Sequence, residues 1–274
     1  MIRDRVLRGE VAEAARVLAR LGLVTAFGHV SARAGDSMLI TPAADLAGVT
    51  AASVIEVPLE GQALPAGAPA EAWAHLALYR ARPDAAAIAR AQPAAALAVA
   101  AVTTAMVPVH GQAAWLGESV PVYDDAALLR SADRAERAAS CLPAGEALLL
   151  RGNGALTLGA TPGLAVARMW LLAAACDVYL AALAASGASP VTTLSDGEIA
   201  SWRAVGGELL PRLWEHLRSG PGSAGPESAG PGPGEEQGQG QPGDHRRPPA
   251  PRVMPLDLRE EREPHGGAPD REQA

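Results

Sequence analysis

The sequence contains no lysine, and all 23 of its basic residues are arginine. A Schiff base, the covalent attachment of pyridoxal phosphate and a nucleotide-binding P-loop each require a lysine amine. Covalent imine chemistry is therefore excluded. The formal net charge is −7, and no basic stripe runs along the chain. This charge pattern argues against nucleic acid as a partner.

Cysteine and long apolar runs are also scarce. Cys141 and Cys176 are the only two cysteines and lack metal-ligand spacing, which favours a reduced cytoplasmic protein. The apolar run over residues 94–107 is too short, and too rich in alanine and threonine, to span a membrane. Residues 3–5 are charged, and no hydrophobic segment follows them, so we expect no secretion signal. The sequence predicts a cytoplasmic protein without a membrane segment.

Aromatic residues make up 3% of the chain, and residues 219–274 have none. That segment is dominated by glycine, proline, glutamate, glutamine and arginine. Such a composition cannot bury enough apolar surface to offset the entropy lost on ordering. We therefore predict a disordered tail over residues 219–274. Residues 1–218 are long enough for a single large core or a three-layer domain.

Hydrophobic periodicity predicts strands that alternate with helices, which implies a layered α/β domain. A glycine-containing turn is expected over residues 25–33. Strands are expected at residues 38–42, 53–59, 85–89, 106–110, 119–123, 148–151 and 155–158. Helices are expected at residues 8–22, 71–82, 94–102, 126–140, 162–183 and 195–218.

The residues most informative about chemistry lie between positions 69 and 92. Glu71 stands at the start of an amphipathic helix, where the helix dipole favours a carboxylate even without a functional role. His75 lies one turn later and is interpreted as a packed helix histidine, with a role beside Glu71 as the alternative. The strand at 85–89 delivers Arg90 and Gln92 to one side, because alternate strand residues share a face.

Six motifs follow one another along the chain in a distinctive order. They are Gly28-His29-Val30-Ser31-Ala32-Arg33, Leu39-Ile40-Thr41-Pro42, Glu71, Tyr79-Arg80-Ala81-Arg82-Pro83-Asp84, Pro108-Val109-His110 and Arg151-Gly152-Asn153-Gly154. In this order they resemble the class II aldolase/adducin family over roughly residues 8–187. The resemblance implies a three-layer α/β/α sandwich around a mixed central sheet. It also implies a homo-oligomer, with a tetramer favoured and active sites between subunits.

The chain departs from the family pattern at its metal site. Family aldolases bind zinc through a His-x-His pair and a third histidine, and these align with Arg90, Gln92 and Asn153. Two serines that would hold a substrate phosphate align with Pro69 and Ala70. The resemblance therefore argues against zinc-dependent cleavage of a sugar phosphate. A divalent metal held by few protein ligands and by the substrate's own hydroxyls stays open as an alternative.

The family also contains decarboxylases of aromatic catabolism, and the combination of His29, Arg90 with Gln92, and Gly152-Asn153-Gly154 resembles that branch. We therefore predict a lyase that decarboxylates a dihydroxylated aromatic carboxylate similar to 3,4-dihydroxyphthalate. The predicted catalytic residues are Glu71, His29 and His110. The predicted substrate-binding residues are Gly28, Ser31, Thr41, Arg90, Gln92 and Asn153.

Each role has an alternative. Arg90 either holds a substrate carboxylate with two parallel N–H donors or forms a structural ion pair with Glu71. Glu71 is assigned acid/base work, and His29 or His110 would protonate the carbon that loses CO₂. His29 is otherwise a turn histidine, and His110 a histidine that ends a strand. Two other functions remain open: an aldolase of an unphosphorylated hydroxy-keto substrate, and a non-catalytic adducin-like binding protein.

Overall fold

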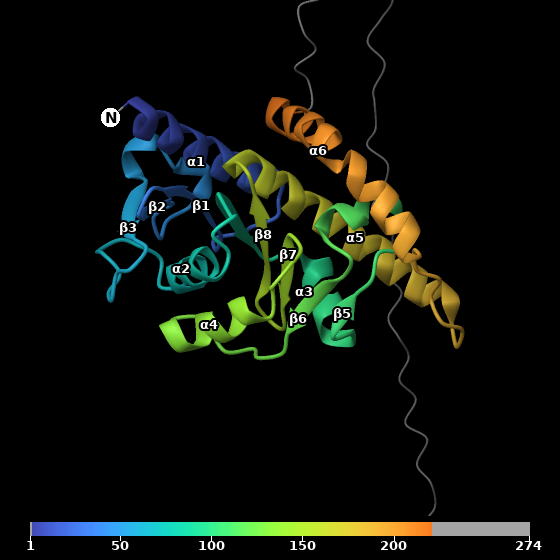
Figure 1. Ribbon diagram of the computed structural model, residues 1–274. Helices are drawn as coiled ribbons and strands as arrows, with labels where there is room; N and C mark the ends of the chain where they lie inside the picture. Colours follow the sequence, from blue (N-terminus) through green and yellow to red (C-terminus); the bar gives the residue numbers. More distant parts are fainter. Residues whose placement is uncertain (1, 221–274) are drawn as a thin grey trace, which may run out of the picture. The chain divides into compact units, whose positions relative to one another are not determined.

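The computed structural model of the protein describes residues 2–220, which form one eight-stranded mixed sheet with helices on both faces (Figure 1). The helices are α1 (Ile2–Arg20), α2 (Ala72–Ala81), α3 (Ala94–Val102), α4 (Ala132–Ser140), α5 (Pro162–Ser186) and α6 (Asp196–Ser219), with short 3-10 helices η1 (Leu46–Gly48), η2 (Ala51–Ser53) and η3 (Gly111–Leu116). The strands are β1 (His29–Ala34), β2 (Ser37–Ile40), β3 (Ile55–Pro58), β4 (Ala87–Ala91), β5 (Ala105–Met106), β6 (Val120–Tyr123), β7 (Ala147–Leu150) and β8 (Gly154–Gly159). The predicted tail lies outside the described residues except for Ser219 and Gly220, so the division at residue 218 stays a prediction.

The strand order is β3-β2-β1-β4-β8-β7-β6-β5, and all neighbours are antiparallel except β6 and β7. His29 at the start of β1 lies opposite Arg90 near the end of β4. Arg90 in turn lies opposite Leu156 of β8, whose hairpin with β7 closes at the same end of the strands. This register brings predicted site residues together at one end of the central strands.

Two hydrophobic cores lie on opposite faces of the sheet, because successive strand residues point to opposite sides. Ile88 and Leu156 belong to the core that includes α2 and α4. Ala87 and Ala89 belong to the core that includes α1, α3 and α5. Each fully buried Leu or Ile stabilises the fold by about 1.5–3 kcal/mol relative to its exposed state. The predicted three-layer α/β/α sandwich is confirmed.

Helix α5 is the central helix of one face. Thr161 caps it by accepting from the Leu164 N–H, and Pro162 occupies its first turn. Among the described helices, it is the one long and apolar enough to cross a membrane by length and composition. Its buried residues all lie between positions 162 and 176 and pack into the core beside the sheet. A core helix has the same pattern, and the predicted cytoplasmic location stays a prediction.

Helix α6 packs against this layer through contacts between glycine and tryptophan. A Cβ atom at Gly163 would lie 2.2 Å from the Trp214 ring, and one at Gly111 would lie 1.8 Å from the Trp202 ring. The Trp115 Nε1–H donates to the Trp202 carbonyl at 2.8 Å. The indoles therefore occupy the space that side chains at the two glycines would need.

Three element predictions need correction. Residues 29–33, expected in a turn, belong to β1, because pairing with both β2 and β4 stabilises the extended backbone. The strand expected at 106–110 is only β5, so His110 does not end a strand and instead precedes η3. The helix expected from residue 126 begins at Ala132, because the Asp125 carboxylate accepts from the Ala127 N–H and closes a turn.

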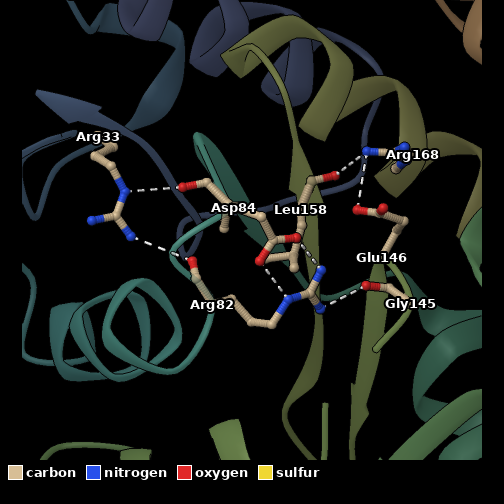
Figure 2. A network of polar contacts seen from close by, with 8 residues as sticks. Arg33, Arg82, Asp84, Gly145, Glu146, Leu158 and Arg168 are labelled. Atoms are coloured by element: carbon tan, nitrogen blue, oxygen red, sulfur yellow. Dashed lines mark hydrogen bonds and ion pairs between the residues drawn. The ribbon is translucent and has the colours of Figure 1, made fainter. Parts of the chain in front are cut away.

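Two arginines, Arg33 of β1 and Arg82 of the Tyr79-Arg80-Ala81-Arg82-Pro83-Asp84 motif, hold backbone segments together (Figure 2). Arg33 donates to the carbonyl of Ala85 at 3.1 Å, and Arg82 donates to that of Gly145 at 2.9 Å. Arg82 also pairs with Asp84 at 2.7 Å. These contacts fix the loop between α2 and β4 to the segment that leads into β7. The Tyr-Arg-x-Arg-Pro-Asp run therefore has a structural explanation.

Candidate functional site

Glu71, Arg90, Gln92 and Asn153 meet beside the end of the central strand β4 and are called the Arg90 cluster below. The Arg90 Nη2 lies 2.9 Å from the Glu71 Oε2 and donates to the Asn153 Oδ1 at 2.6 Å. The Asn153 Nδ2 donates to the Glu71 Oε1 at 2.9 Å. The Gln92 Nε2 donates to the same Asn153 Oδ1 at 3.3 Å. The expectation that Arg90 and Gln92 lie on one side of β4 agrees with this geometry.

Local backbone structure places each member of the cluster. Glu71 directly precedes α2, where the helix dipole favours a carboxylate, and its Oε1 also accepts from the Leu129 N–H at 3.4 Å. Asn153 lies in the β7–β8 hairpin, where Gly154 has a φ of +84°. A Cβ atom at position 154 would come within 2.2 Å of the Ala91 carbonyl oxygen. Only glycine lets the hairpin approach β4 closely enough to bring Asn153 to the cluster.

Arg90 is a buried cation whose charge is balanced by one carboxylate. Its side chain is 1% exposed, while that of Glu71 is 12% exposed. Burial lowers the pKa of the Arg90 guanidinium from its ordinary value, and Glu71 opposes this shift. Arginine nevertheless stays charged in proteins. The Arg90 Nε and Nη1 atoms are buried and have no hydrogen-bond partner among residues 2–220.

The Arg90 cluster does not fit a tetrahedral zinc ion. Such sites use imidazole, thiolate or carboxylate ligands, whereas the cluster offers a guanidinium and two carboxamides beside one carboxylate. The guanidinium already places a positive charge against Glu71, and a divalent cation there would be repelled. Among the described residues, no group of three or more His, Cys, Asp or Glu side chains could hold a metal ion.

A second polar group lies behind the cluster, between β1 and α2. The His29 and His75 rings are 5.8 Å apart at an angle of 63°. The Ser31 Oγ lies 2.8 Å from the His75 Nδ1 and 2.8 Å from the Tyr79 hydroxyl. Burial, reinforced by the charge of Arg90, lowers the pKa of His75 to about 3. Burial, and then His75 and Arg90, hold the pKa of His29 well below its usual value, so both rings are neutral at pH 7.

The hydrogen-bonded chain of His75, Ser31 and Tyr79 was not predicted. The available signal was spacing: His75 and Tyr79 are four residues apart on one helix face, and Ser31 lies two residues after His29. That signal has meaning only once residues 29–33 are recognised as a strand.

Three predicted substrate-binding residues, Gly28, Ser31 and Thr41, pack closely inside the fold. Ser31 is fully buried, and its hydroxyl is engaged by His75 and Tyr79. Thr41 is fully buried, and its Oγ1 accepts from the Val30 N–H at 3.2 Å. A Cβ atom at Gly28 would lie 2.4 Å from Val24 Cγ1. The Ser31 and Thr41 side chains therefore stabilise β1, and contact of these residues with a substrate stays a prediction.

The three predicted catalytic residues do not all meet within one chain. His29 and Glu71 both lie next to Arg90. His110 precedes η3, which packs against α5 and α6, and burial lowers its pKa. Among residues 2–220, no hydrogen bond or ion pair links His110 to the Arg90 cluster. The structure therefore groups His29 with Glu71 and leaves His110 apart.

Comparison with known proteins adds an independent observation. The family model described as "Class II Aldolase and Adducin N-terminal domain" matches residues 9–180. Human beta-adducin is 30% identical over 159 residues, which are 56% of this chain and 22% of beta-adducin. A 4-hydroxy-3-prenylphenylpyruvate oxygenase/4-hydroxy-3-prenylbenzoate synthase from Streptomyces roseochromogenus subsp. oscitans is 33% identical over 118 residues, 43% of each protein. The chain thus spans less than half the length of these relatives.

Solved structures show the same architecture. L-fuculose-1-phosphate aldolase from Thermus thermophilus is 28% identical with a TM-score of 0.61, over 69% of this chain and 100% of that enzyme. An aldolase II superfamily protein from Pseudomonas syringae has a TM-score of 0.66 at 22% identity, over 79% of this chain and 94% of that protein. The second likeness concerns the fold alone.

Proposed function

The chain belongs to the class II aldolase and adducin family, and from that premise we propose that it is a carbon–carbon lyase acting on a small carboxylate. Within this class we favour decarboxylation of a dihydroxylated aromatic carboxylate similar to 3,4-dihydroxyphthalate. The name of the Streptomyces relative supports an aromatic, carboxylate-bearing substrate. The misfit between the Arg90 cluster and zinc favours a reaction other than that of the Thermus aldolase.

The observation that carries the proposal is the buried pair of Arg90 and Glu71, with two carboxamides beside it. Loss of CO₂ from a hydroxylated ring needs electron density at the ring carbon that bears the carboxylate. A ring hydroxyl supplies that density once it is deprotonated. A fixed cation and preorganised N–H donors stabilise the resulting oxyanion more strongly in a poorly solvated site than they would in water.

Glu71 is assigned the proton transfers, because it is the more exposed partner of the ion pair. Its carboxylate takes the proton of a ring hydroxyl and delivers it to the ring carbon that bears the departing carboxylate. The bond from that carbon to the carboxylate then breaks, its electron pair restores the aromatic ring, and CO₂ leaves. Water returns a proton to the ring oxygen. No step passes through a metal.

His29 is assigned hydrogen bonding rather than protonation of carbon. Its lowered pKa keeps the ring neutral, and a neutral imidazole is a poor acid. Arg90 is assigned charge compensation rather than a direct grip on the substrate carboxylate, because its Nη2 is already held by Glu71 and Asn153. His110 has no assigned step within one chain.

The test is an assay of the full-length protein with 3,4-dihydroxyphthalate and related hydroxylated dicarboxylates, following CO₂ release. A parallel arm supplies unphosphorylated hydroxy-keto compounds and follows aldol cleavage. Release of CO₂ that is lost in Glu71→Gln supports the decarboxylase. Cleavage of an aldol without CO₂ release from any substrate keeps the lyase class and overturns the decarboxylase.

A non-catalytic binding protein is the second candidate, supported by the match to human beta-adducin. In that case the pair of Arg90 and Glu71 serves structure alone. The absence of turnover in both assay arms, together with unfolding of Glu71→Gln, would favour this reading.

Assembly is also part of the proposal. We expect a homo-oligomer, with a tetramer favoured, as the family resemblance implies. Light scattering of the protein as it elutes from a size-exclusion column measures the mass directly, and a monomer at micromolar concentration would contradict this.

A further inference from the structure

We propose that Tyr79, Ser31 and His75 form a buried chain of hydrogen bonds that fixes the tautomer of His29 through one internal water molecule. His75 is then a positioning residue, acting on a ligand only through His29. The inference deepens the proposed function and rests on it for the use that His29 serves. The arrangement of protons itself is independent of any substrate.

The direction of the chain follows from its hydrogen atoms. The Ser31 Oγ lies 2.8 Å from both the Tyr79 hydroxyl and the His75 Nδ1. Ser31 is the only side-chain partner of the Tyr79 hydroxyl among the described residues. If Tyr79 donates to Ser31, then Ser31 donates its own hydrogen to His75, and every group is satisfied. The reverse order leaves the phenolic hydrogen buried without an acceptor, which is costly.

The surroundings of Tyr79 support this direction. The Arg33 guanidinium lies 4.9 Å from the centre of the Tyr79 ring, and arginine has only donors to offer. Burial raises the pKa of Tyr79, so the phenol keeps its proton. His75 therefore accepts at Nδ1. Since its ring is neutral, the single ring hydrogen is on Nε2.

Four nitrogen atoms next to this chain are buried without a partner among residues 2–220. They are the His75 Nε2, the His29 Nδ1 and the Arg90 Nε and Nη1. Their side chains are neighbours: the two rings are 5.8 Å apart, and His29 lies opposite Arg90 across the strand pair. Unpaired polar atoms on three neighbouring buried side chains favour a small molecule between them that both accepts and donates hydrogen bonds.

A water molecule has that chemistry. It accepts from the His75 Nε2–H and from one Arg90 N–H, and it donates to the His29 Nδ1. Three hydrogen bonds are the usual number for a buried water. An anion would satisfy the donors, but it would leave the His29 Nδ1 without a hydrogen unless that atom carried its own.

The consequence for the site is that His29 carries its hydrogen on Nε2. His29 keeps 8% of its surface exposed, and its Nε2 is absent from the enclosed, unpaired nitrogens. The ring can then offer an N–H donor to a ligand oxygen, such as the ring oxygen that becomes negative in the proposed reaction. The other tautomer would present a lone pair and repel that oxygen.

The test is long-range ¹H–¹⁵N correlation of the full-length protein labelled at histidine and studied at pH 7. We expect His29 and His75 each to show a single neutral tautomer with the hydrogen on Nε2. Ser31→Ala should replace both single tautomers with mixtures, and Tyr79→Phe should do so partly. The matched control is Thr157→Val, which removes another buried hydroxyl, one that bonds to Ala165 on the other face of the sheet. It should leave both tautomers unchanged.

Several results would overturn the inference. One is a wild-type spectrum in which either ring is doubly protonated or carries its hydrogen on Nδ1. Another is a folded Ser31→Ala protein in which His75 changes and His29 does not, which would break the link through water. The wild-type spectrum decides the matter even if the variants fail to fold. It needs no turnover, so failure of the decarboxylase assay leaves this result intact.

Discussion

The Arg90 guanidinium and the Glu71 carboxylate form a buried ion pair, with 2.9 Å between Nη2 and Oε2. Arg90 lies in β4 and Glu71 directly precedes α2, so the pair joins the sheet to the helix layer that covers it. Asn153 bridges the two side chains by accepting from Arg90 and donating to Glu71. The same contacts can stabilise the fold and position a reacting group, and single and double variants of the pair separate these roles.

Removing one partner should cost more stability than removing both. Glu71→Leu leaves Arg90 buried without a counter-charge, which costs about 3–5 kcal/mol. The double variant Glu71→Leu/Arg90→Met removes both charges and should recover much of this loss. Urea unfolding of the wild type, Glu71→Leu, Arg90→Met and the double variant gives the coupling energy between the two residues. Costs that simply add would mean that the two residues do not interact.

Arg90→Lys should be a poor replacement. The Arg90 Nη2 makes the contacts to both Glu71 and Asn153, and an ammonium on a shorter side chain cannot place its nitrogen there equally well and loses its charge more readily when buried. Loss of one charge-assisted hydrogen bond costs about 1.5–3 kcal/mol, or roughly tenfold to a hundredfold in kcat/KM on a converted substrate. Arg8→Lys is the control, because Arg8 forms more exposed pairs with Asp4 and Glu56. Equal behaviour of the two variants would remove the special role of Arg90.

Glu71→Gln should lower kcat by about 10²–10⁴, since it keeps shape and hydrogen bonding but cannot move a proton. The control is Glu56→Gln, which alters a more exposed carboxylate on β3. Thermal unfolding of both proteins must accompany the kinetics. Wild-type activity in Glu71→Gln would show that Glu71 does not transfer the proton.

The purified protein should hold zinc far below one equivalent, because imidazole and thiolate are missing where tetrahedral ligation needs them. The triple variant Arg90→His/Gln92→His/Asn153→His should gain roughly one equivalent, since three imidazoles would replace the guanidinium and the carboxamides. Elemental analysis after dialysis against a weak chelator measures both. Tightly held stoichiometric zinc in the wild type would contradict the account of the cluster.

Stability should fall as the pH falls below about 6.5. The pKa of His75 is about 3 in the folded protein, and an unfolded histidine titrates near 6.5. Between these values the unfolded chain binds more protons, so folding loses up to about 1.4 kcal/mol per pH unit for each such histidine. His29 adds to the slope in the same direction.

The pH effect is measured by urea unfolding at pH 7, 6, 5 and 4. His75→Asn should reduce the slope even if it lowers stability at every pH. His216→Asn removes an exposed imidazole on α6 and is the control. An unchanged slope in His75→Asn would mean that His75 is already charged in the folded protein.

Gly154→Ala should destabilise the protein and displace Asn153. Its positive φ costs about 1–3 kcal/mol in a residue with a Cβ atom, and the overlap with the Ala91 carbonyl adds to that. Gly9→Ala is the control, because Gly9 lies within α1 with nothing near its missing Cβ. That change should stabilise by about 0.5–1 kcal/mol. Comparable melting temperatures for the two variants would contradict this.

The fold was largely predictable because it depends on patterns that local sequence carries. Helix α3 begins and ends where its periodicity predicts, and the Thr161–Pro162 start of α5 is visible in the sequence. The start of β1 was missed because Gly28 looks like a turn residue, whereas pairing on both sides of His29–Ala34 decides the outcome. The pairing of β1 with β4 joins residues far apart in the sequence, such as His29 and Arg90, and leaves no local trace.

The site was predictable in part, where it depends on strand geometry and on the order of the motifs. Arg90 and Gln92 share a side of β4 because of strand geometry, and their meeting with Asn153 followed from the motif order. The enclosure of Ser31 and the separate place of His110 could not be predicted. They depend on which helix covers each stretch of sheet and on how η3 packs against α6.

The glycine–tryptophan contacts of α6 also determine what a spectroscopist would see. Four of the five tryptophans, at positions 115, 170, 202 and 214, lie in α5, α6 or η3, and only Trp73 lies on α2. Intrinsic fluorescence therefore reports mainly on whether α6 stays packed against α5 and η3. A site variant that shifts the emission strongly has disturbed either the layer on the far side of the sheet or Trp73 on α2. One that leaves the emission unchanged has kept the surroundings of the tryptophans.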